Sequence, residues 1–445
     1  MFFDYYGQEN RNIFICNFDC ENYWSETKFM RLPSVDLYKI KSIIQNLDEL
    51  FIFLARKEDV LVLRKKPDDN FIHYLQSLDV DIPHILTVSS DDEKKSISQL
   101  ILADIDLINA LKHFTNENLK KNIITNLIPY GVTTAEEKLS NCINTRLLSN
   151  SQTSAMLNCK LTLKELSSQL NVTVPESIMC EGSEELQNIG MAFVEKYKQV
   201  VIKELFGSGG SGLAKVNGTV QFKKIIEHMK RFNNLDGKII LEKWHTSKIS
   251  YNHQYVIMNG SVYPHAFSKQ LINSKSGNIM GSIFYQKPNR KIQENHYILC
   301  KPILDEILQK GYQGLIGFDS IICNKNLIFP IVDINCRVNL STIFYEVWTR
   351  YFSSVFASFF CKEYMLDEPM SFVSLIEKIS SVAYSFTKKE GIIILNFTSL
   401  NTNILNSKGK IGRVFYGIFA RSEQRAKEIC EKVFFEEDIL MGGKQ

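Results

Sequence analysis

The sequence has few features that would crosslink the chain or direct it to nucleic acid. Ten cysteines are scattered over 445 residues with no Cys-x-x-Cys pair, which is too dilute for a disulfide scaffold and typical of a reducing cytosol. Lys and Arg number 52 and Asp and Glu 49, a net charge of +3. This charge excludes the strongly basic footprint of a dedicated nucleic-acid binder. We therefore expect a cytoplasmic protein that binds no nucleic acid.

Long uninterrupted hydrophobic runs are also missing. The opening residues MFFDYY contain an acid and no basic stretch, so they do not predict a signal peptide. The most apolar stretch, Ser341–Cys361, contains Glu346 and Arg350, both costly to place in lipid. We predict that this stretch is a buried amphipathic helix, and we expect no membrane association.

The composition is that of a globular protein with a large core, since 44% of the residues are hydrophobic and 23% charged. Short apolar runs at Asn12–Cys16, Leu50–Leu54 and Val60–Leu63 alternate with helical patterns, which predicts an α/β layer. One long helix is predicted over Ile97–Phe114. A polar, Ser- and Asn-rich stretch at 144–154 places a domain boundary near residue 150.

The predicted fold class is α/β, with three units at 1–150, 151–365 and 366–445. Residues 366–445 give the pattern helix, strand, polar turn, strand, helix, which predicts a small α/β unit. We expect this C-terminal unit to pack beside the functional site as a lid.

A glycine-rich loop is the most informative motif of the middle unit. It consists of Gly207, Ser208, Gly209, Gly210, Ser211 and Gly212, between predicted strands at Gln199–Leu205 and Leu213–Val216. Such a loop can lie close on a ligand and turn its backbone N–H groups toward an anion. It is neither a Walker A sequence nor a dinucleotide fingerprint that opens a helix. The alternative is a hairpin turn that binds no ligand.

Oxygen-bearing side chains gather on a second predicted hairpin. Asp319 lies on one strand and Asp333 on the returning strand. Asn335 and Arg337 follow Asp333 at two-residue steps and therefore share its face. Two carboxylates and an amide suit Mg²⁺ bound together with a nucleotide, and the arginine adds hydrogen-bond donors for a phosphoryl group. Taken alone, the same residues are more often a solvated sheet face.

Taken in order, these motifs resemble those of an ATP-grasp ligase. An Asn158-x-Lys160 motif, a strand lysine at Lys203 and the sequence Leu241–Trp244 join the glycine loop and the Asp319 hairpin. Further motifs are similar to the peptide and aminoacyl ligases of pheganomycin and butirosin biosynthesis, which carry an N-terminal pre-ATP-grasp domain. They are residues 17–21, residues 129–133, and Gln270 before Gly281-Ser282.

The resemblance implies a pre-ATP-grasp domain, a two-lobed ATP-grasp domain, and ATP with Mg²⁺, or Mn²⁺ in its place, as cofactors. Lys160 and Lys203 would bind the phosphates under the glycine loop. Glu242, Lys243 and Trp244 would form the hinge against which adenine binds. Asp319, Asp333 and Asn335 would hold the metal, and Arg337 would be the catalytic residue that stabilises the acyl-phosphate.

Two positions depart from the family pattern. The acid expected to bind ribose after the hinge is absent, which leaves Ser250, Asn252 and Gln254 as alternatives. Position 333 is Asp where Glu is usual. His245 and His253 are interpreted as structural rather than catalytic, because no acid stands at a defined spacing from either.

The implied function is an ATP-dependent carboxylate–amine ligase that joins amino-acid or peptide substrates through an acyl-phosphate. One alternative loads an amino acid onto the thiol of an acyl carrier protein. From another class, the chain is a phosphotransferase on the same fold or a nucleotide-binding regulator without turnover. A homodimer is also an open alternative.

Overall fold

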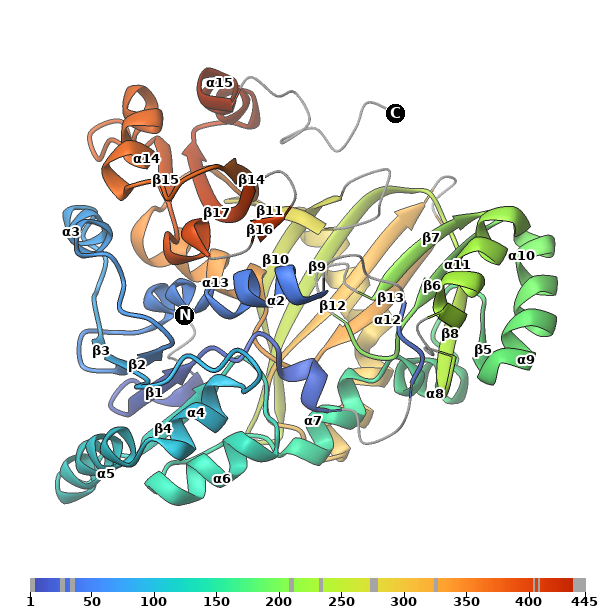
Figure 1. Cartoon of the computed structure of the whole chain (residues 1–445), viewed down its shortest axis with the longest axis horizontal. Coiled ribbons are helices and arrows are strands. Elements are labelled where there is room, and N and C mark those ends of the chain that lie inside the picture. The colour runs from blue at the N-terminus through green and yellow to red at the C-terminus, as the bar shows by residue number, and fades with distance from the viewer. Residues whose placement is uncertain are drawn as a thin grey trace.

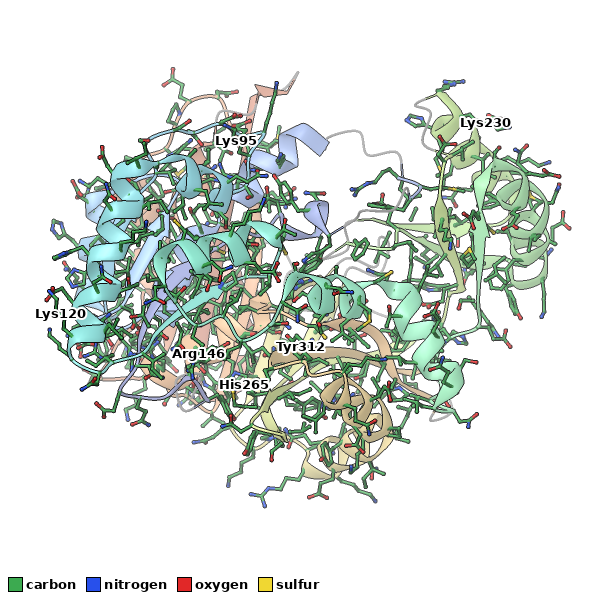
Figure 2. The ribbon with its side chains drawn as sticks, turned by 90° about the horizontal axis from the view of Figure 1, so that it is seen from below. Lys95, Lys120, Arg146, Lys230, His265 and Tyr312 are labelled. Carbon is green, nitrogen blue, oxygen red and sulfur yellow. The ribbon has the colours of Figure 1, made fainter. Side chains whose placement is uncertain are left out.

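The computed structural model describes residues 5–24, 29–32, 37–207, 212–231, 235–272, 279–323, 327–402, 405–406 and 409–434. The strands of the described residues form three sheets. In Figure 1 the N-terminal sheet and a small sheet lie on opposite sides of a large one. Figure 2 shows the molecule from below, with Lys120 and Lys230 toward its opposite ends.

The N-terminal sheet is parallel, with strand order β3-β2-β1-β4. Its strands are β1 (Arg11–Ile15), β2 (Val60–Leu63), β3 (His84–Thr87) and β4 (Thr125–Pro129). All residues of β2 and β4 are buried, as expected for a parallel sheet covered on both faces. The predicted α/β layer is therefore confirmed. The apolar run Leu50–Leu54, however, belongs to a 3₁₀ helix, η2 (Asp48–Leu54), and not to a strand.

The single helix predicted over Ile97–Phe114 is wrong. Two helices are present, α4 (Ile97–Ala103) and α5 (Ile105–Lys120). Asp104 separates them because its backbone is extended and its carboxylate accepts a hydrogen bond from the Leu107 N–H at 3.0 Å. An acidic side chain that caps a new helix in this way competes with continuation of the old one. The other helices of this unit are α2 (Leu37–Gln45), α3 (Asp69–Ser77) and α6 (Thr134–Ile143).

The small sheet is antiparallel, with order β5-β8-β6-β7. Its strands are β5 (Ser177–Glu181), β6 (Gln199–Lys203), β7 (Leu213–Asn217) and β8 (Lys238–Lys243). One core joins these strands to α10 (Met191–Tyr197) and α11 (Thr219–Arg231). The short helix α9 (Gly182–Glu185) follows β5 and has no buried residue. Two preceding helices, α7 (Ser151–Asn158) and α8 (Lys160–Gln169), instead share a core with the large sheet.

The large sheet runs β13-β12-β9-β10-β11-β14-β17-β15, with β16 (Leu405–Asn406) beside β17. Its remaining strands are β9 (Ser247–Met258), β10 (Ser261–Ile272), β11 (Ile279–Tyr285), β12 (Gly314–Cys323), β13 (Ile328–Asn335), β14 (Phe356–Leu366), β15 (Gly391–Ile394) and β17 (Gly409–Ala420). Asn259 and Gly260 have φ of 51° and 73°, which confirms the predicted turn between β9 and β10. The helices α12 (Arg290–Gln309), α13 (Leu340–Glu346), α14 (Phe372–Ile379) and α15 (Glu423–Phe434) complete this part.

The stretch Ser341–Cys361 is not one helix as predicted. The helix α13 passes into a π-helical turn, Val347–Tyr351, and the chain then enters β14. The residues Phe356–Phe360 are all buried, so the aromatic run fills a strand covered on both faces. Periodicity cannot separate such a strand from a buried helix.

The C-terminal segment shares the large sheet. β14 and β17 pair antiparallel along the eleven residues Phe356–Leu366, whose partners run from Ala420 back to Lys410. The segment after residue 366 therefore extends the sheet on the side away from β13. Its role as a lid stays a prediction. No helix within the described ranges is both long and apolar enough to span a membrane.

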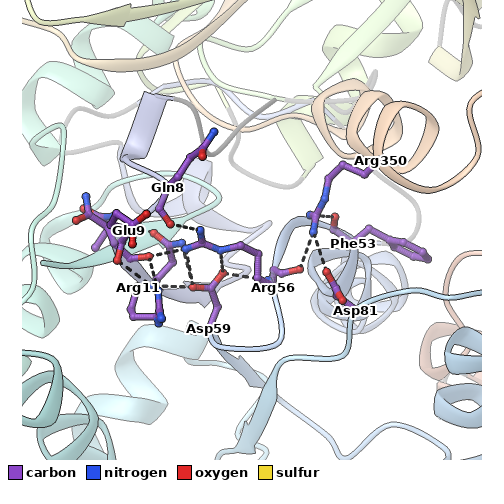
Figure 3. A network of polar contacts seen from close by, with 12 residues as sticks. Gln8, Glu9, Arg11, Phe53, Arg56, Asp59, Asp81 and Arg350 are labelled. Atoms are coloured by element: carbon purple, nitrogen blue, oxygen red, sulfur yellow. Dashed lines mark hydrogen bonds and ion pairs between the residues drawn. The ribbon is translucent and has the colours of Figure 1, made fainter. Parts of the chain in front are cut away.

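Polar contacts join the N-terminal unit to the π-helical turn that follows α13. The Arg350 guanidinium donates to the Phe53 carbonyl oxygen at 2.9 Å and lies 3.5 Å from Asp81 (Figure 3). Nearby, Arg56 pairs with Asp59 at 3.2 Å within the N-terminal unit. Because Arg350 comes from the π turn after α13, these bonds join the two units at a defined place.

Candidate active site

Two lysines contact one buried glutamate between the small sheet and α8. Glu242 lies on β8 and is 4% exposed. Its Oε1 is 2.7 Å from Lys203 Nζ at the end of β6, and its Oε2 is 2.5 Å from Lys164 Nζ. Lys164 lies four residues after Lys160 on α8, so the two side chains share a face of that helix. The site thus gathers more positive than negative charge.

The contacts of Glu242 with Lys203 and Lys164 determine the protonation states of these three side chains. Burial acts to raise the pKa of Glu242, but the Lys203 and Lys164 ammonium groups hold that pKa below its usual value. Burial likewise opposes the charged form of Lys203, yet Glu242 and Asp333 raise the pKa of Lys203. Burial lowers the pKa of Lys164. Lys203 and Glu242 are therefore a buried ion pair that stays charged near neutral pH.

Lys160 links the glycine loop to the oxygen-bearing hairpin. Its Nζ donates to the carbonyl oxygen of Gly207 at 3.1 Å and lies 3.5 Å from Asp333 Oδ2. Gly212 at the other end of the loop has its carbonyl oxygen 2.8 Å from the Glu204 N–H. The predicted loop residues Ser208, Gly209, Gly210 and Ser211 lie outside the described residues.

The two predicted metal-binding acids occupy directly opposed positions. The register of β12 and β13 pairs Asp319 with Asp333, so the two carboxylates share one face of the sheet. Asp319 Oδ1 accepts hydrogen bonds from Asn252 at 2.8 Å and from Gln270 at 2.7 Å. Burial and the nearby Asp333 charge raise the pKa of Asp319 to about 6. A half-buried pair of like charges of this kind favours a bound cation.

Asn335 and Arg337 extend this group toward the N-terminal unit. Asn335 Nδ2 donates to Asp319 Oδ2 at 3.4 Å, and Asn335 Oδ1 accepts from Arg337 Nη2 at 2.7 Å. Arg337 also donates to Glu21 and Tyr130 of the N-terminal unit. The four residues predicted from the hairpin are therefore brought together.

The donor set fits a hard divalent cation. Within the described part of the chain no three His, Cys, Asp or Glu side chains gather into a metal-binding cluster. A cation here would take the Asp319 and Asp333 carboxylates and oxygens from water or phosphate. It would take the Asn335 amide oxygen only in place of the hydrogen bond that this oxygen accepts from Arg337. Such an all-oxygen set with few protein ligands is typical of Mg²⁺ beside a nucleotide.

The hinge residues lie beside the lysine cluster, but their amide protons are occupied. The Lys243 N–H donates to the Glu176 carbonyl oxygen at 2.8 Å, and the Trp244 N–H to the Gln199 carbonyl oxygen at 3.0 Å. Lys215 Nζ lies 4.4 Å from the centre of the Trp244 ring. An adenine edge at these two residues would meet carbonyl oxygens, and the contact stays a prediction.

Two of the ribose alternatives serve another purpose. Asn252 is 3% exposed and bonds to Asp319, while Gln254 is 2% exposed and donates to Asn339 at 3.0 Å and Ser341 at 2.7 Å. These side chains hold the N-terminus of α13 against the acid pair. They do not fit a ribose-binding role.

The sequence analysis missed Lys164, Glu21 and Tyr130 as members of the site. The spacing of four between Lys160 and Lys164 was a usable signal, since it places both on one helix face. Glu21 and Tyr130 lay inside motifs noted for the N-terminal unit, but nothing in the sequence placed them near Arg337. Their contacts are made across 316 and 207 residues of chain.

Comparison with known proteins identifies two domain families. Residues 48–144 match the pre-ATP-grasp domain, and residues 161–335 match the ATP-grasp domain of prokaryotic glutathione synthetase. A curated relative from Niallia circulans, [butirosin acyl-carrier protein]–L-glutamate ligase, is 22% identical over 317 residues, which span 70% of this chain and 68% of the relative.

Solved structures share the fold. N5-carboxyaminoimidazole synthase from Aspergillus clavatus, with ADP and an aminoimidazole ribonucleotide, gives a TM-score of 0.53 at 11% identity and covers 96% of this chain and 98% of its own. The corresponding synthetase from Staphylococcus aureus gives 0.52 at 11% identity, with 96% and 97% covered. At these identities the likeness shows the fold alone.

Proposed function

Since this chain is an ADP-forming ATP-grasp ligase with a pre-ATP-grasp domain, we propose that it joins a carboxylate to an amine and makes a peptide or an amino-acid amide. The observation that carries this proposal is the contact of 3.5 Å between Lys160 and Asp333. It brings a side chain suited to binding phosphate next to one suited to binding a metal ion. A nucleotide phosphate bound at that contact would touch cations on one side and an oxygen-bound metal on the other.

The residues divide into three roles. Lys160, Lys203 and the loop Gly207–Gly212 bind the phosphates of ATP, and the hinge Glu242–Trp244 lies against the adenine. Asp319, Asp333 and Asn335 hold Mg²⁺, which neutralises phosphate charge when it is bound. Lys164 keeps Glu242 paired when Lys203 turns toward a phosphate, because the two lysines bind different oxygens of that carboxylate.

The chemistry has two steps. A substrate carboxylate oxygen attacks the γ-phosphorus of ATP, the bond to the bridging oxygen breaks, and ADP leaves. The amine nitrogen then attacks the acyl carbon of the acyl-phosphate, phosphate leaves, and the nitrogen loses a proton. Fixed cations lower both barriers because negative charge develops on oxygen in each step. We assign the stabilisation of that charge to Arg337, which donates to Asn335 Oδ1 at 2.7 Å.

A second candidate follows from the curated relative, whose name specifies an acyl-carrier protein and L-glutamate. In this version the first step is the same, and the thiol of a carrier protein attacks the acyl-phosphate and forms a thioester. Asp319, Asp333 and the lysines would bind the metal and ATP in the same way in both versions. The versions differ in the group that attacks the acyl-phosphate, which is an amine in the first and a thiol in the second.

The test is an ADP-release screen with Mg²⁺ and amino acids or short peptides, singly and in pairs, with and without a phosphopantetheinylated carrier protein. Mass spectrometry of each active mixture identifies the product. ADP with a new amide supports the first candidate, and ADP with a carrier thioester the second. ADP with a phosphorylated acceptor would establish a phosphotransferase, and tight ATP binding with no turnover in any mixture would indicate a regulator.

A further inference from the structure

The two carboxylate oxygens of Asp319 have different neighbours. Oδ1 accepts hydrogen bonds from Asn252 Nδ2 at 2.8 Å and from Gln270 Nε2 at 2.7 Å. Among the described residues, Oδ2 accepts one long hydrogen bond, from Asn335 Nδ2 at 3.4 Å. A carboxylate has about four lone-pair sites, two on each oxygen. Oδ1 is therefore fully used by the protein, whereas Oδ2 keeps an open site.

The order of the strands explains this difference. β12, which carries Asp319, lies between β13 and β9, and β10 follows β9. The donors to Oδ1 come from β9 and β10, and the contact of Oδ2 comes from β13. Asp333 also lies on β13, directly opposite Asp319. The open oxygen is therefore on the side of the second acid, where a cation bound by both carboxylates would lie.

Hydrogen bonds that start from a backbone N–H fix the orientation of the Asn252 amide. The Thr342 N–H can only donate, and it donates to Asn339 Oδ1 at 3.1 Å. Gln254 Nε2 donates to the same oxygen at 3.0 Å and to Asn252 Oδ1 at 2.9 Å. Because its amide oxygen is held in this way, Asn252 presents Nδ2 to Asp319.

The backbone of β12 leaves room for these amides at Gly317. A Cβ atom at this position would lie 2.6 Å from Asn339 Nδ2 and 3.3 Å from Asn252 Nδ2. Gly317 precedes Asp319 by two residues, so both positions face the same side of the sheet. Any larger residue at 317 would displace the two amides. The local sequence of β12 is thus suited to the hydrogen bonds that hold Oδ1.

Mg²⁺ and Ca²⁺ differ in what they require from a carboxylate. Mg²⁺ needs near-octahedral geometry at about 2.0–2.1 Å and usually takes one or two carboxylates with water and phosphate oxygens. Ca²⁺ takes about six to eight oxygens and readily binds both oxygens of one carboxylate. With Oδ1 occupied by two N–H donors, Asp319 can offer a cation only Oδ2. This arrangement suits the smaller cation.

We propose that Asn252 and Gln270 are positioning residues that determine the cation preference of the site. They restrict Asp319 to coordination through one oxygen and thereby favour Mg²⁺ over Ca²⁺. This inference rests on the proposed function, because Asp319 and Asp333 are assigned there as metal ligands. Removing an outer partner of a metal ligand typically changes metal affinity by about 10–100-fold.

The chain supplies a matched control. Gln45 Nε2 donates to Asp19 Oδ2 at 2.9 Å, and both residues are buried in the N-terminal unit. Methionine has nearly the length of glutamine and no N–H donor in its side chain. Gln45→Met therefore repeats the chemical change of Gln270→Met, since each removes a glutamine donor from an aspartate, but it does not touch Asp319.

The experiment measures the ratio of the Ca²⁺ and Mn²⁺ dissociation constants on the full chain with a non-hydrolysable ATP analogue. Bound Mn²⁺ is followed by electron paramagnetic resonance, and Ca²⁺ is added as the competitor. We expect Gln270→Met to shift the ratio toward Ca²⁺ by about 10-fold or more, and Gln45→Met to leave it unchanged. A loss of stability that weakens both cations alike does not move this ratio.

A second variant removes the other donor to Oδ1. If Gln270→Met does not fold, Asn252→Ser replaces it, because serine keeps a small polar group beside Gln254 but has no amide to reach Asp319. We expect the same shift toward Ca²⁺. An unchanged ratio in the variant that folds overturns the proposal, as does an equal shift in Gln45→Met.

The two proposals fail separately. The ratio needs no acyl substrate, so it decides the cation preference even if the wild-type protein forms no amide or thioester, an outcome that would refute the proposed function alone. A wild-type protein that forms product, with an unchanged ratio in Gln270→Met, would overturn the positioning role alone. A wild-type protein that binds no Mn²⁺ with the nucleotide would also overturn the positioning role.

Discussion

Lys160 and Asp333 face each other with 3.5 Å between the ammonium nitrogen and the nearer carboxylate oxygen. One was predicted to bind phosphate and the other a metal. In the structure they neutralise each other, and Lys160 also holds the carbonyl oxygen of Gly207. A bound metal–nucleotide complex would replace this contact with two stronger ones, since Asp333 would face the metal and Lys160 a phosphate.

Lys160→Ala should weaken ATP binding by about 10–150-fold, because a charge-assisted hydrogen bond contributes about 1.5–3 kcal/mol. The fold should persist, since the groups that Lys160 leaves behind are the partly exposed Asp333 and the carbonyl oxygen of Gly207. Isothermal titration calorimetry with ATP and Mg²⁺ measures the affinity. Lys120→Ala is the control, because Lys120 forms an exposed pair with Glu117 on α5. Equal ATP affinities for the two variants would remove Lys160 from the phosphate site.

Lys203→Ala should behave differently from Lys160→Ala. Its removal leaves the buried Glu242 carboxylate with Lys164 alone, and breaking a buried pair typically costs about 3–5 kcal/mol. We expect a lower melting temperature as well as weaker ATP binding. The double variant Lys203→Met with Glu242→Gln should recover part of the melting temperature but none of the ATP affinity. Recovery of both would show that Lys203 acts only as a partner of Glu242.

Asp333→Asn and Asp319→Asn should each lower ADP release by at least 100-fold while the fold stays intact. Each change removes a carboxylate oxygen from the metal site, and it also relieves the repulsion between two directly opposed acids. The melting temperature without ligand should therefore stay the same or rise for Asp319→Asn, whereas Asp333→Asn also loses the contact with Lys160. Asn335→Ala should lower turnover in the same way. Steady-state assays over a range of Mg²⁺ concentrations, with melting curves, test this expectation. Normal Mg²⁺ dependence in any of these variants would place the metal elsewhere.

Local motifs predicted much of this site, because its oxygen ligands lie on one hairpin. The two-residue steps from Asp333 to Arg337 placed three side chains on a common face, and the register of β12 and β13 added Asp319. What could not be predicted depends on tertiary contact. Arg337 meets Glu21 across 316 residues, and neither strand periodicity nor motif spacing carries information about such a pair.

The errors in the fold have a similar origin. Ile97–Phe114 was predicted as one helix because its apolar stripe is continuous, whereas Asp104 caps a second helix. Ser341–Cys361 is largely apolar, and only the pairing of Phe356–Cys361 within the large sheet decides that its end is a strand. In the first case the helical pattern was right and one capping side chain breaks the helix. In the second a correct hydrophobic pattern was assigned a wrong backbone, because burial on both faces of a strand removes the polar face that distinguishes helix from strand.

Asp48 should make the stability of the N-terminal unit depend on pH. Burial raises the pKa of Asp48 to about 7, above its value of about 4 in an unfolded chain. The folded state therefore binds this proton more tightly, so the free energy of unfolding is highest at low pH and falls as the pH rises through about 7.

Asp48→Asn keeps an oxygen that can accept the bond from the Arg64 N–H, which is 2.7 Å long in the wild type. We expect the stability of this variant relative to the wild type to be greater at pH 8 than at pH 5 by about 1 kcal/mol or more, because the wild type loses this stabilisation between about pH 4 and pH 7. Urea unfolding at both pH values measures the difference. A variant that is equally less stable at both would show that Asp48 is needed in its charged form.

The last prediction concerns Arg337, where binding and chemistry should separate. If Arg337 stabilises the charge that develops as the acyl-phosphate forms and collapses, Arg337→Ala should lower kcat by roughly 10²–10³-fold, the effect of losing one oxyanion donor. ATP affinity should change little, because the lysine cluster is untouched. Arg337→Lys should recover little activity, since one ammonium group cannot replace a fork that contacts Glu21, Asn335 and Tyr130.

The alternative is that Arg337 only joins the two domains. A lysine would then keep most of the activity by pairing with Glu21, or the loss of activity would follow the fall in melting temperature in both variants. Measuring kcat, ATP affinity and melting temperature for the two variants decides between these cases. A large fall in kcat at nearly constant ATP affinity, at a temperature where both variants remain folded, would assign Arg337 to the reaction itself. Full activity in the lysine variant would assign it to the domain interface.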